Sequence, residues 1–323
     1  MKALRLHGPG DLRLGDEPEP TPGEGELLLR VRAVGLCGSD RHWFVEGSIG
    51  DAVLSRPLVL GHEFAATIES GPRAGERVAV DPADPCRRCS VCLSDRPHLC
   101  PELRFAGHGA TDGALRTLLA WPERLVHPLP DSLSDAEGAL LEPLGVALHA
   151  LDLGHVRAGA AAGVFGCGPL GLLLVQLLRM VGALVLADEP LPHRLEAAKQ
   201  LGASRPPGEG VDVAFEVAGE DEALARAIDE VRPGGRVVVV GIPEGDRTSF
   251  TASTARRKGL TIALCRRMRS TDLPRAARLA ETGRVELAPL VSARFALSEW
   301  QQAFGDLVER RGLKAVVEPQ REA

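Results

Sequence analysis

The pattern of apolar and polar positions changes along the chain near residue 150. Before that point, short apolar or alternating runs bounded by Gly and Pro predict strands of a β-rich domain, as in ELLLRVRAV at 26–34 and ERVAV at 76–80. After it, apolar runs dense in Val, Leu and Ala alternate with helical patterns, which is typical of a parallel sheet covered by helices on both faces. These runs are AAGVFG, LVLAD, VDVAFEVAG, RVVVVG and LTIALC.

The chain is long enough for two domains, because its 323 residues exceed what one hydrophobic core usually supports. We expect a β-rich domain over residues 1–150 and an α/β domain, a doubly wound parallel sheet, over residues 151–286. Near the end, SEWQQAFGDLVERRG and KAVVEP predict one more helix and strand without a further βαβ unit. We therefore expect residues 287–323 to return and complete the first domain.

Composition and charge restrict the partners and the compartment. The net charge is −6, the isoelectric point is near 5.9, and no long run of Lys or Arg offers a footprint for nucleic acid. The charged, Pro-rich N-terminus lacks the apolar core of a signal peptide. The most apolar stretch, 163–187, is interrupted by Gln176 and Arg179, so it predicts a buried strand, helix and strand instead of a membrane span. We expect a cytoplasmic protein with no nucleic-acid and no membrane partner.

Four of the seven cysteines fall in one short stretch, CRRCSVCLSDRPHLC. In a chain without a leader this favours a metal site over disulfides. Tetrahedral zinc takes four thiolates at about 2.3 Å, which would fold a loop with few apolar residues around the metal. A disulfide pair and an iron–sulfur cluster are the alternatives, but a ferredoxin run would continue with C-x3-C-P. We expect a structural zinc held by Cys86, Cys89, Cys92 and Cys100.

A Gly-rich turn follows the first apolar run of the second half. GVFGCGPLG has the G-x-G-x-x-G pattern, directly after a strand and at the start of the helix PLGLLLVQLLRM. Such a turn lets the backbone approach a pyrophosphate, which then lies on the positive N-terminus of the helix. The predicted cofactor-binding residues of the turn are Gly166, Gly168, Pro169, Leu170 and Gly171.

The end of the next strand bears on the choice of nucleotide. LVLAD ends in Asp188, twenty residues after Gly168, where a carboxylate would hydrogen-bond an adenosine ribose and repel a 2′-phosphate. This favours NAD over NADP. Arg194 lies near enough in sequence to accept such a phosphate, so NADP stays the alternative.

Three further segments of the first domain carry metal-ligand chemistry. Cys37 lies in GLCGSDRHW, His62 and Glu63 lie in GHEFAAT, and Glu142 lies in LLEPLG. A lone His or Glu in such a place would more often be structural. Together, Cys37, His62 and Glu63 supply three protein ligands and leave one exchangeable position, as catalytic zinc requires. Glu142 is a second carboxylate that could ligate the metal or accept a proton from its water.

These motifs resemble those of the zinc-dependent medium-chain dehydrogenases, especially the polyol (sorbitol or xylitol) and threonine dehydrogenase branch. The resemblance spans nearly the whole chain, through CGSDRH, GHE, the four-cysteine stretch, EPLG, the Gly-rich turn and PLVSARFAL. It implies a GroES-like catalytic domain and a Rossmann-type NAD-binding domain. It also implies one catalytic and one structural zinc per chain, and a homo-oligomer that is a dimer or a tetramer.

The resemblance assigns roles to the ligand candidates. In that family, the residues matching Cys37, His62 and Glu63 surround the catalytic zinc, and the glutamate matching Glu142 lies beside it. Alcohol dehydrogenases of the liver type carry a cysteine at that last position. Glu142 therefore favours the polyol or threonine side of the family.

The segment GLCGSDRHW also holds the groups that would carry the proton. Ser39 and His42 match the family's proton-relay positions, with the hydroxyl near the zinc-bound oxygen and the imidazole nearer solvent. Asp40, between them, is expected to be a structural turn residue.

The implied reaction is hydride transfer to NAD from a secondary alcohol that is a polyol or a sugar alcohol. Threonine dehydrogenase activity is the nearest alternative. A non-catalytic NAD-binding protein that keeps zinc only for folding would have no need of an open metal site. A zinc-free quinone or enoyl reductase would lack both cysteine features.

Three features depart from the family pattern. The segment 203–210 is short, so we expect a sheet without the usual outermost strand 3 and a shallower wall beside the adenine. Trp43 follows the relay histidine where polyol members often have Tyr, which weakens the inference about the substrate. The segment CRRMRS is either a solvated basic surface or the source of a pocket residue that favours an anionic or polyhydroxylated substrate. Its candidates are Arg266, Arg267 and Arg269.

Overall fold

The computed structural model describes residues 1–204, 209–245 and 247–322. The chain divides into two compact units, Met1–Glu142 with Arg269–Ala323 and Pro143–Met268, and each is described by itself. The division falls within one helix, α4 (Leu141–Gly154).

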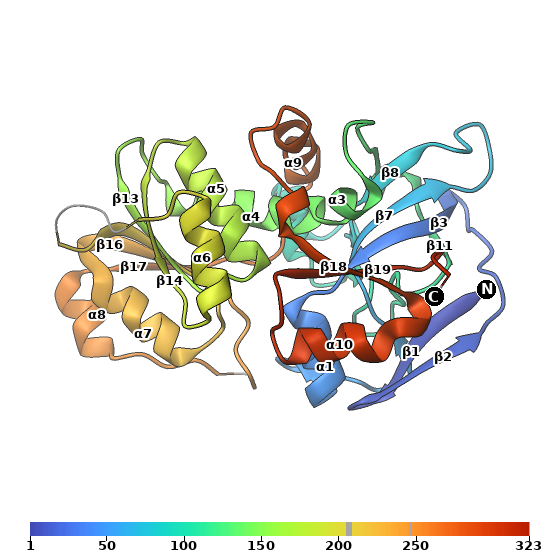
Figure 1. The fold of residues 1–323 in the computed structure, drawn as a ribbon, viewed down its shortest axis with the longest axis horizontal. Coiled ribbons are helices and arrows are strands. Elements are labelled where there is room, and N and C mark those ends of the chain that lie inside the picture. Colours follow the sequence, from blue (N-terminus) through green and yellow to red (C-terminus); the bar gives the residue numbers. More distant parts are fainter. Residues whose placement is uncertain (205–208, 246, 323) are drawn as a thin grey trace. The chain divides into compact units, whose positions relative to one another are not determined.

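The first unit is built on a seven-stranded, mostly antiparallel sheet (Figure 1). Leu29 and Val31 alternate with more exposed residues along the strand predicted at 26–34, and both are fully buried. The C-terminal strand pairs antiparallel with that strand, so that Val316 lies opposite Gly35. The strand order is β12 (Val126–Pro128), β8 (Arg77–Val80), β7 (Glu63–Ile68), β3 (Glu26–Gly35), β19 (Lys314–Glu318) and β18 (Val291–Ala296), with β11 (Leu118–Pro122) also paired to β3.

Two helices of this unit pack against each other on one side of the sheet. They are α1 (Gly38–Glu46) and α10 (Trp300–Val308), which lie side by side in Figure 1. The ring centroids of Phe44 and Phe304 are 5.0 Å apart at this contact. The remaining elements are β1 (Lys2–Gly8), β2 (Asp11–Asp16), β4 (Ser48–Ile49), β5 (Ala52–Val53), β6 (Leu58–Val59), β9 (Ala83–Asp84), α2 (Ser90–Leu93), β10 (Arg104–Phe105), α3 (Asp135–Ala139) and α9 (Asp272–Glu281).

The second unit is a five-stranded parallel sheet with helices packed on it, which confirms the predicted Rossmann-type arrangement. The strand order is β14 (Leu184–Asp188), β13 (Ala161–Phe165), β15 (Val211–Glu216), β16 (Val231–Val239) and β17 (Thr261–Leu264). One helix pair packs mainly on β14 and β13 and the other mainly on β15 and β16. These pairs are α5 (Pro169–Met180) with α6 (Pro192–Gln200), and α7 (Asp221–Glu230) with α8 (Ala252–Lys258).

One edge of this sheet is β14. In the order 3-2-1-4-5-6 of dinucleotide-binding sheets, a further strand would pair with the strand at this position. No strand in the described part of the chain does so. The expected loss of strand 3 is therefore confirmed for the described residues, although part of the short segment, 205–208, lies outside them.

The apolar stretch 163–187 runs from β13 through α5 into β14, which is the predicted strand, helix and strand. No described helix combines the length and the apolar character that crossing a bilayer would require.

Candidate metal and cofactor sites

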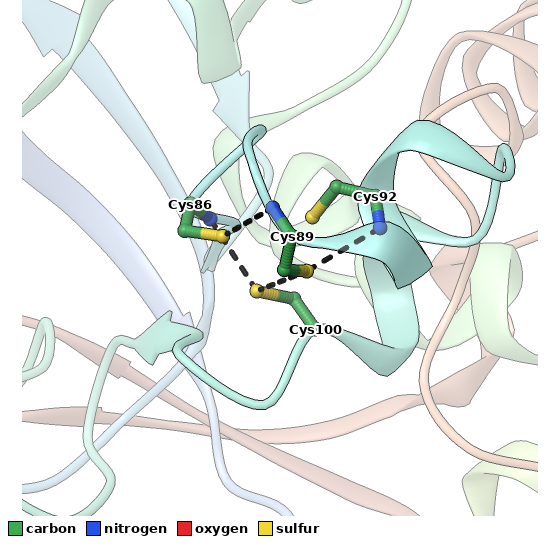
Figure 2. Close-up of side chains that lie close together, drawn as sticks. All are labelled: Cys86, Cys89, Cys92 and Cys100. Atoms are coloured by element: carbon green, nitrogen blue, oxygen red, sulfur yellow. Dashed lines mark hydrogen bonds between the residues drawn. The ribbon is translucent and has the colours of Figure 1, made fainter.

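The four-cysteine stretch forms a lobe whose base is closed by the antiparallel pairing of β9 and β10. Figure 2 shows the four sulfur atoms turned toward one another. They lie within 4.8 Å of each other, and the Sγ atoms of Cys89 and Cys100 are 3.9 Å apart. Four sulfurs in a tetrahedron around zinc are about 3.8 Å apart, whereas a disulfide joins sulfurs at about 2 Å. The spacing therefore fits zinc, and all seven cysteines are free thiols in the structure.

Backbone N–H groups point at these sulfurs. The amide of Cys89 donates to Sγ of Cys86, and that of Cys92 donates to Sγ of Cys89, each at 3.4 Å. The N–H groups of Arg88 and Cys89 lower the pKa of Cys86 to about 7, which favours the thiolate. Burial and the neighbouring thiols raise the pKa of Cys92 to about 12. Thiols crowded in this way can all ionise only around a cation, which is the second sign that a metal fits.

The second cluster gathers one ligand atom each from Cys37, His62 and Glu63, all within 4.8 Å of one another. The pairing of β3 with β7 explains this convergence, because it places Gly35 opposite Glu63. Cys37 follows the end of β3 by two residues and caps the N-terminus of α1. A thiol, an imidazole and a carboxylate form a donor set that zinc accepts, and three ligands leave a fourth position for an oxygen.

Asp40 holds these two segments together. Its side chain is fully buried, Oδ2 accepts the N–H of Cys37 at 2.9 Å, and Oδ1 accepts the N–H of Gly61 at 3.2 Å. The same Oδ1 lies 3.8 Å from Nδ1 of His62. Burial raises the pKa of this carboxyl, and the charge of His62 opposes that shift. Asp40 was expected to be a structural turn residue. Its hydrogen bonds agree with this and also fix the backbone at Cys37 and at Gly61, next to His62.

Glu63 has a buried cationic partner. Nζ of Lys314 lies 2.6 Å from its Oε2 and donates to the carbonyl of Leu36 at 2.9 Å. Burial alone would lower the pKa of Lys314, but the carboxylate of Glu63 and the thiol of Cys37 raise it. Burial and Glu63 raise the pKa of Cys37, which Lys314 in turn opposes. A metal cation between these groups would favour the thiolate further.

The two predicted proton-relay residues, Ser39 and His42, both lie on α1. Oγ of Ser39 is 3.4 Å from Nε2 of His62. His42 is buried, and its Nδ1 lies 2.7 Å from Oε1 of Glu46, one turn later on α1. The structure thus places the Ser39 hydroxyl beside the ligand set and ties the His42 ring to a carboxylate.

Glu142 is buried at the start of α4 but is not among the ligand atoms that lie within 4.8 Å of one another in the described residues. Burial raises its pKa to about 7, which the charge of His62 opposes and that of Glu63 reinforces. It is therefore close enough to sense the cluster electrostatically without joining its ligand atoms.

The Gly-rich turn connects β13 to α5. Gly166 has φ +100°, and a Cβ there would lie 2.8 Å from the backbone nitrogen of Ala218, so only glycine fits. A Cβ on Gly171 would collide with the carbonyl of Gly166, which keeps the helix close to the strand. Pro169 occupies the first position of α5, and Leu170 follows it. This local geometry suits a pyrophosphate at the helix N-terminus.

Two acidic residues, Asp188 and Glu189, stand at the end of β14. Asp188 ends β14, and its Oδ2 accepts Nε of Arg226 on α7 at 2.6 Å. Glu189, the next residue, accepts the N–H of Cys167 inside the turn at 2.7 Å. A Cβ on Gly168 would lie 3.6 Å from Nη1 of Arg194, so that guanidinium is beside the turn.

The three arginines of the basic segment CRRMRS have different surroundings. Arg266 is exposed, which fits the reading as a solvated surface. Nε of Arg269 lies 3.2 Å from Oδ2 of the buried Asp272 at the start of α9. The backbone carbonyl of Arg267 accepts Nδ1 of His149 at 2.7 Å.

Motif reasoning missed three charged residues of these sites: Asp40 as a clamp, Lys314 and Glu189. Asp40 stands three residues after Cys37, the N3 position of a capping box, which was a usable signal. The lysine at the start of the apolar strand KAVVEP was a second signal for a charged partner. A lysine in a buried strand is rarely found without an acidic partner. Glu189 had no signal beyond its place next to Asp188.

Two family models match the chain: the alcohol dehydrogenase GroES-like domain over residues 23–131 and the zinc-binding dehydrogenase over residues 169–282. The chain is 32% identical over 346 residues to sorbitol dehydrogenase of Bacillus subtilis, covering 99% of this chain and 98% of the relative.

Two solved structures show the same fold. A putative zinc-binding dehydrogenase of Sinorhizobium meliloti bound to NADP superimposes with a TM-score of 0.88 at 29% identity, covering 98% of this chain and 99% of that one. An Escherichia coli protein described as a short chain alcohol dehydrogenase, complexed with NADH, has a TM-score of 0.88 at 25% identity over 98% of this chain and 99% of its own.

Proposed function

The chain belongs to the zinc-binding medium-chain alcohol dehydrogenase family, and we propose that it transfers hydride to NAD from a secondary alcohol that is a polyol or a sugar alcohol. The family consists of zinc-dependent, NAD(P)-linked alcohol and polyol dehydrogenases, so the chain is an enzyme of this class. One observation carries the proposal: the ligand atoms of Cys37, His62 and Glu63 converge within 4.8 Å. A zinc ion held by these three protein ligands would take the alcohol oxygen as its fourth.

The two cofactors supply the difficult chemistry when bound: zinc acidifies a hydroxyl, as it lowers the pKa of water from about 15.7 to about 7, and NAD accepts the hydride. The chain's own residues hold the zinc and move the proton. The proposed catalytic zinc ligands are Cys37, His62 and Glu63, and the proposed structural zinc ligands are Cys86, Cys89, Cys92 and Cys100.

The proton leaves the substrate hydroxyl through Ser39 and His42 in this proposal. Ser39 is supported by the 3.4 Å separation of its Oγ from Nε2 of His62, which sets it at the ligand cluster. The carboxylate of Glu46 accepts Nδ1–H of His42 at 2.7 Å, so the neutral ring keeps its lone pair on Nε2. Nε2 of His42 is therefore the atom that receives the proton and passes it to solvent.

Glu142 is proposed as the second carboxylate of the reaction site. Its exclusion from the set of converging ligand atoms among the described residues favours a role as a proton acceptor over that of a ligand. Its raised pKa, about 7, suits such an exchange near neutral pH.

The dinucleotide is proposed to lie on the Gly-rich turn, with its pyrophosphate at the N-terminus of α5 and near Arg194. Similar structures bind NADP in one case and NADH in another, so the family alone does not select the nucleotide. Acidic residues at the end of β14 support NAD, because a carboxylate there repels a 2′-phosphate. Sorbitol dehydrogenase as a relative supports a polyol substrate.

The test compares the wild type with Cys37→Ser and, as a matched control, Cys265→Ser, which changes a thiol outside both clusters. NADH formation is screened over polyols, sugar alcohols, threonine and simple secondary alcohols, and zinc is measured per chain. We expect two zinc ions and turnover of a polyol in the wild type and the control. Cys37→Ser should keep one zinc and bind NADH while losing turnover. Full turnover in Cys37→Ser, or none in the wild type on any alcohol, contradicts the proposal.

A further inference from the structure

A cavity of about 530 Å³ lies between α9 (Figure 1) and residues 127–131, which form the end of β12 and the loop after it. A cavity of this size is in the range of small-molecule sites. Every lining residue belongs to the first unit, and none is among the proposed zinc, proton-relay or dinucleotide residues. The cavity is therefore a second candidate ligand site, built from residues that the proposed reaction does not use.

The walls of this cavity offer apolar surface. On α9, Pro274 and Ala277 stand one turn apart and line the cavity. On the opposite wall, Leu129 is 5% exposed and lies between two prolines that also line the cavity. Such walls can hold the methylene chain of a ligand, because covering apolar surface is favourable.

Four ionisable side chains also line the cavity: His127, Asp131, Arg278 and Glu281. None of the four makes a side-chain hydrogen bond or an ion pair with another residue in the described part of the chain. Arg278 and Glu281 are three residues apart on one helix, a spacing at which opposite charges can pair, and they do not pair. Burial lowers the pKa of His127, so its ring is neutral near pH 7. All four groups are thus available to a ligand.

The charges of these groups define a complementary ligand. Asp131 and Glu281 carry one negative charge each and Arg278 carries one positive charge, so one negative charge is left over. Arg278 would repel a simple cation, and the two carboxylates would repel a simple anion. A ligand with one carboxylate and two cationic groups leaves none of these charges unpaired. A basic α-amino acid has these groups, joined by a methylene chain that suits the apolar walls.

We propose that this cavity binds a basic α-amino acid, as lysine, ornithine and arginine are. The carboxylate of the ligand pairs with Arg278, and its two cationic groups pair with Asp131 on one wall and Glu281 on the other. The neutral imidazole of His127 accepts a further hydrogen bond, and the methylene chain packs on Leu129. This site is distinct from the proposed hydride transfer and does not depend on it.

Binding is measured by calorimetric titration of the full chain with zinc bound, at pH 7 and a constant ionic strength of about 0.15 M, which screens exposed charges equally in every titration. We expect L-lysine to bind with a dissociation constant of about 1 mM or less, the range for a ligand of about ten non-hydrogen atoms. Norleucine lacks the side-chain amine and cadaverine lacks the carboxylate, so each should bind at least about tenfold more weakly. Equal binding of these three compounds, or no binding of lysine, ornithine or arginine, overturns the proposal.

Variants locate the site. Arg278→Gln and Glu281→Gln each remove one charge and should weaken lysine binding by about tenfold. Arg278→Gln should also abolish the preference for lysine over cadaverine, because cadaverine has no carboxylate to lose. The control is Arg284→Gln, which changes an exposed arginine beyond the end of α9 and should leave lysine binding within about twofold of the wild type.

A steric variant gives a readout without a change of charge. Ala277→Trp fills the cavity and should abolish lysine binding, and thermal unfolding checks the fold of each variant. Unchanged lysine binding in Arg278→Gln and Glu281→Gln would place the ligand elsewhere and overturn the proposal. If Ala277→Trp does not fold, these two charge variants decide alone, because both positions are exposed.

Discussion

Nζ of Lys314 lies 2.6 Å from Oε2 of Glu63, and each side chain is about 2% exposed. The two residues are 251 positions apart and meet because the last strand of the chain, β19, pairs with β3. A Cβ on Gly35 would collide with the same carboxylate in its present position, so the glycine leaves room for the Glu63–Lys314 pair. A lone buried carboxylate is costly, and Lys314 offsets its charge beside the proposed catalytic zinc site.

Replacing Lys314 by Met should destabilise the protein by about 3–5 kcal/mol, because it leaves Glu63 buried without a partner. The free energy of unfolding in urea, measured after the catalytic zinc has been removed by chelation, tests this, because Glu63, a proposed zinc ligand, would otherwise keep the metal as a partner. The exposed Lys199 on α6 is the control, and Lys199→Met should change stability by less than about 0.5 kcal/mol.

The double variant Glu63→Gln/Lys314→Met isolates the pair. Its destabilisation should fall short of the sum of the two single effects, since the second change removes the orphaned charge. Strict additivity would mean that Lys314 acts through packing or through the Leu36 carbonyl alone.

Asp40→Asn should weaken zinc binding at the catalytic cluster by about 10-fold to 100-fold, as loss of an outer hydrogen-bond partner commonly does. An amide has only one oxygen, so it cannot accept the N–H groups of both Cys37 and Gly61 as the carboxylate does. Zinc affinity is measured by competition with a chromophoric chelator. The structural zinc serves as the internal reference, and its affinity should not change.

Features that depend on short motifs and on the spacing of neighbouring residues could be predicted from the sequence. The cysteine spacing predicted that four thiols would converge, and the βαβ rhythm predicted the parallel sheet with its Gly-rich turn. Cys37, His62 and Glu63 were predicted from short motifs, and their ligand atoms do lie together. Their roles as ligands, and those of Ser39, His42 and Glu142 in proton transfer, stay predictions.

Long-range and directional features were beyond such patterns. Lys314 reaches Glu63 only through the sheet register of a strand at the far end of the chain, which no local spacing encodes. The partners of Asp40 are backbone N–H groups. Nearly every residue has such a group, so no residue type in the sequence marks these partners. The distinction between Asp188 and Glu189 depends on where two neighbouring side chains point, which only the ion pair with Arg226 and the turn amide of Cys167 reveal.

Removing one thiol of the four-cysteine lobe should release one zinc and unfold the lobe locally. Cys92→Ser leaves three thiolates around the metal, and the stretch from 86 to 100 has few apolar residues to hold it otherwise. Limited proteolysis should then cut within this stretch, and metal analysis should find one zinc per chain instead of two. Intact resistance to protease in the zinc-depleted variant would show that the lobe folds without metal.

The acid side of the stability profile should depend on a cluster around Arg5. Its guanidinium donates to Asp112 at 2.9 and 3.0 Å and to Glu17 at 2.7 Å. Burial opposes the shift, but the hydrogen bonds from Arg5 and from the N–H of Val59 lower the pKa of Asp112. The bond from Arg5 lowers that of Glu17 as well.

Because the folded-state pKa values lie below the unfolded ones, near 4, the folded chain holds fewer protons there. The stabilisation is complete above about pH 5 and is lost as the pH falls through the lowered values. Asp112→Asn should therefore cost about 1–2 kcal/mol at pH 7 and progressively less below about pH 4. Urea unfolding from pH 3 to 7 measures this, with Asp11→Asn, in an exposed pair with Arg13, expected to have no measurable effect. A penalty for Asp112→Asn that does not change with pH would assign its role to hydrogen-bond geometry, because only an ionised group can lose its contribution as protons bind.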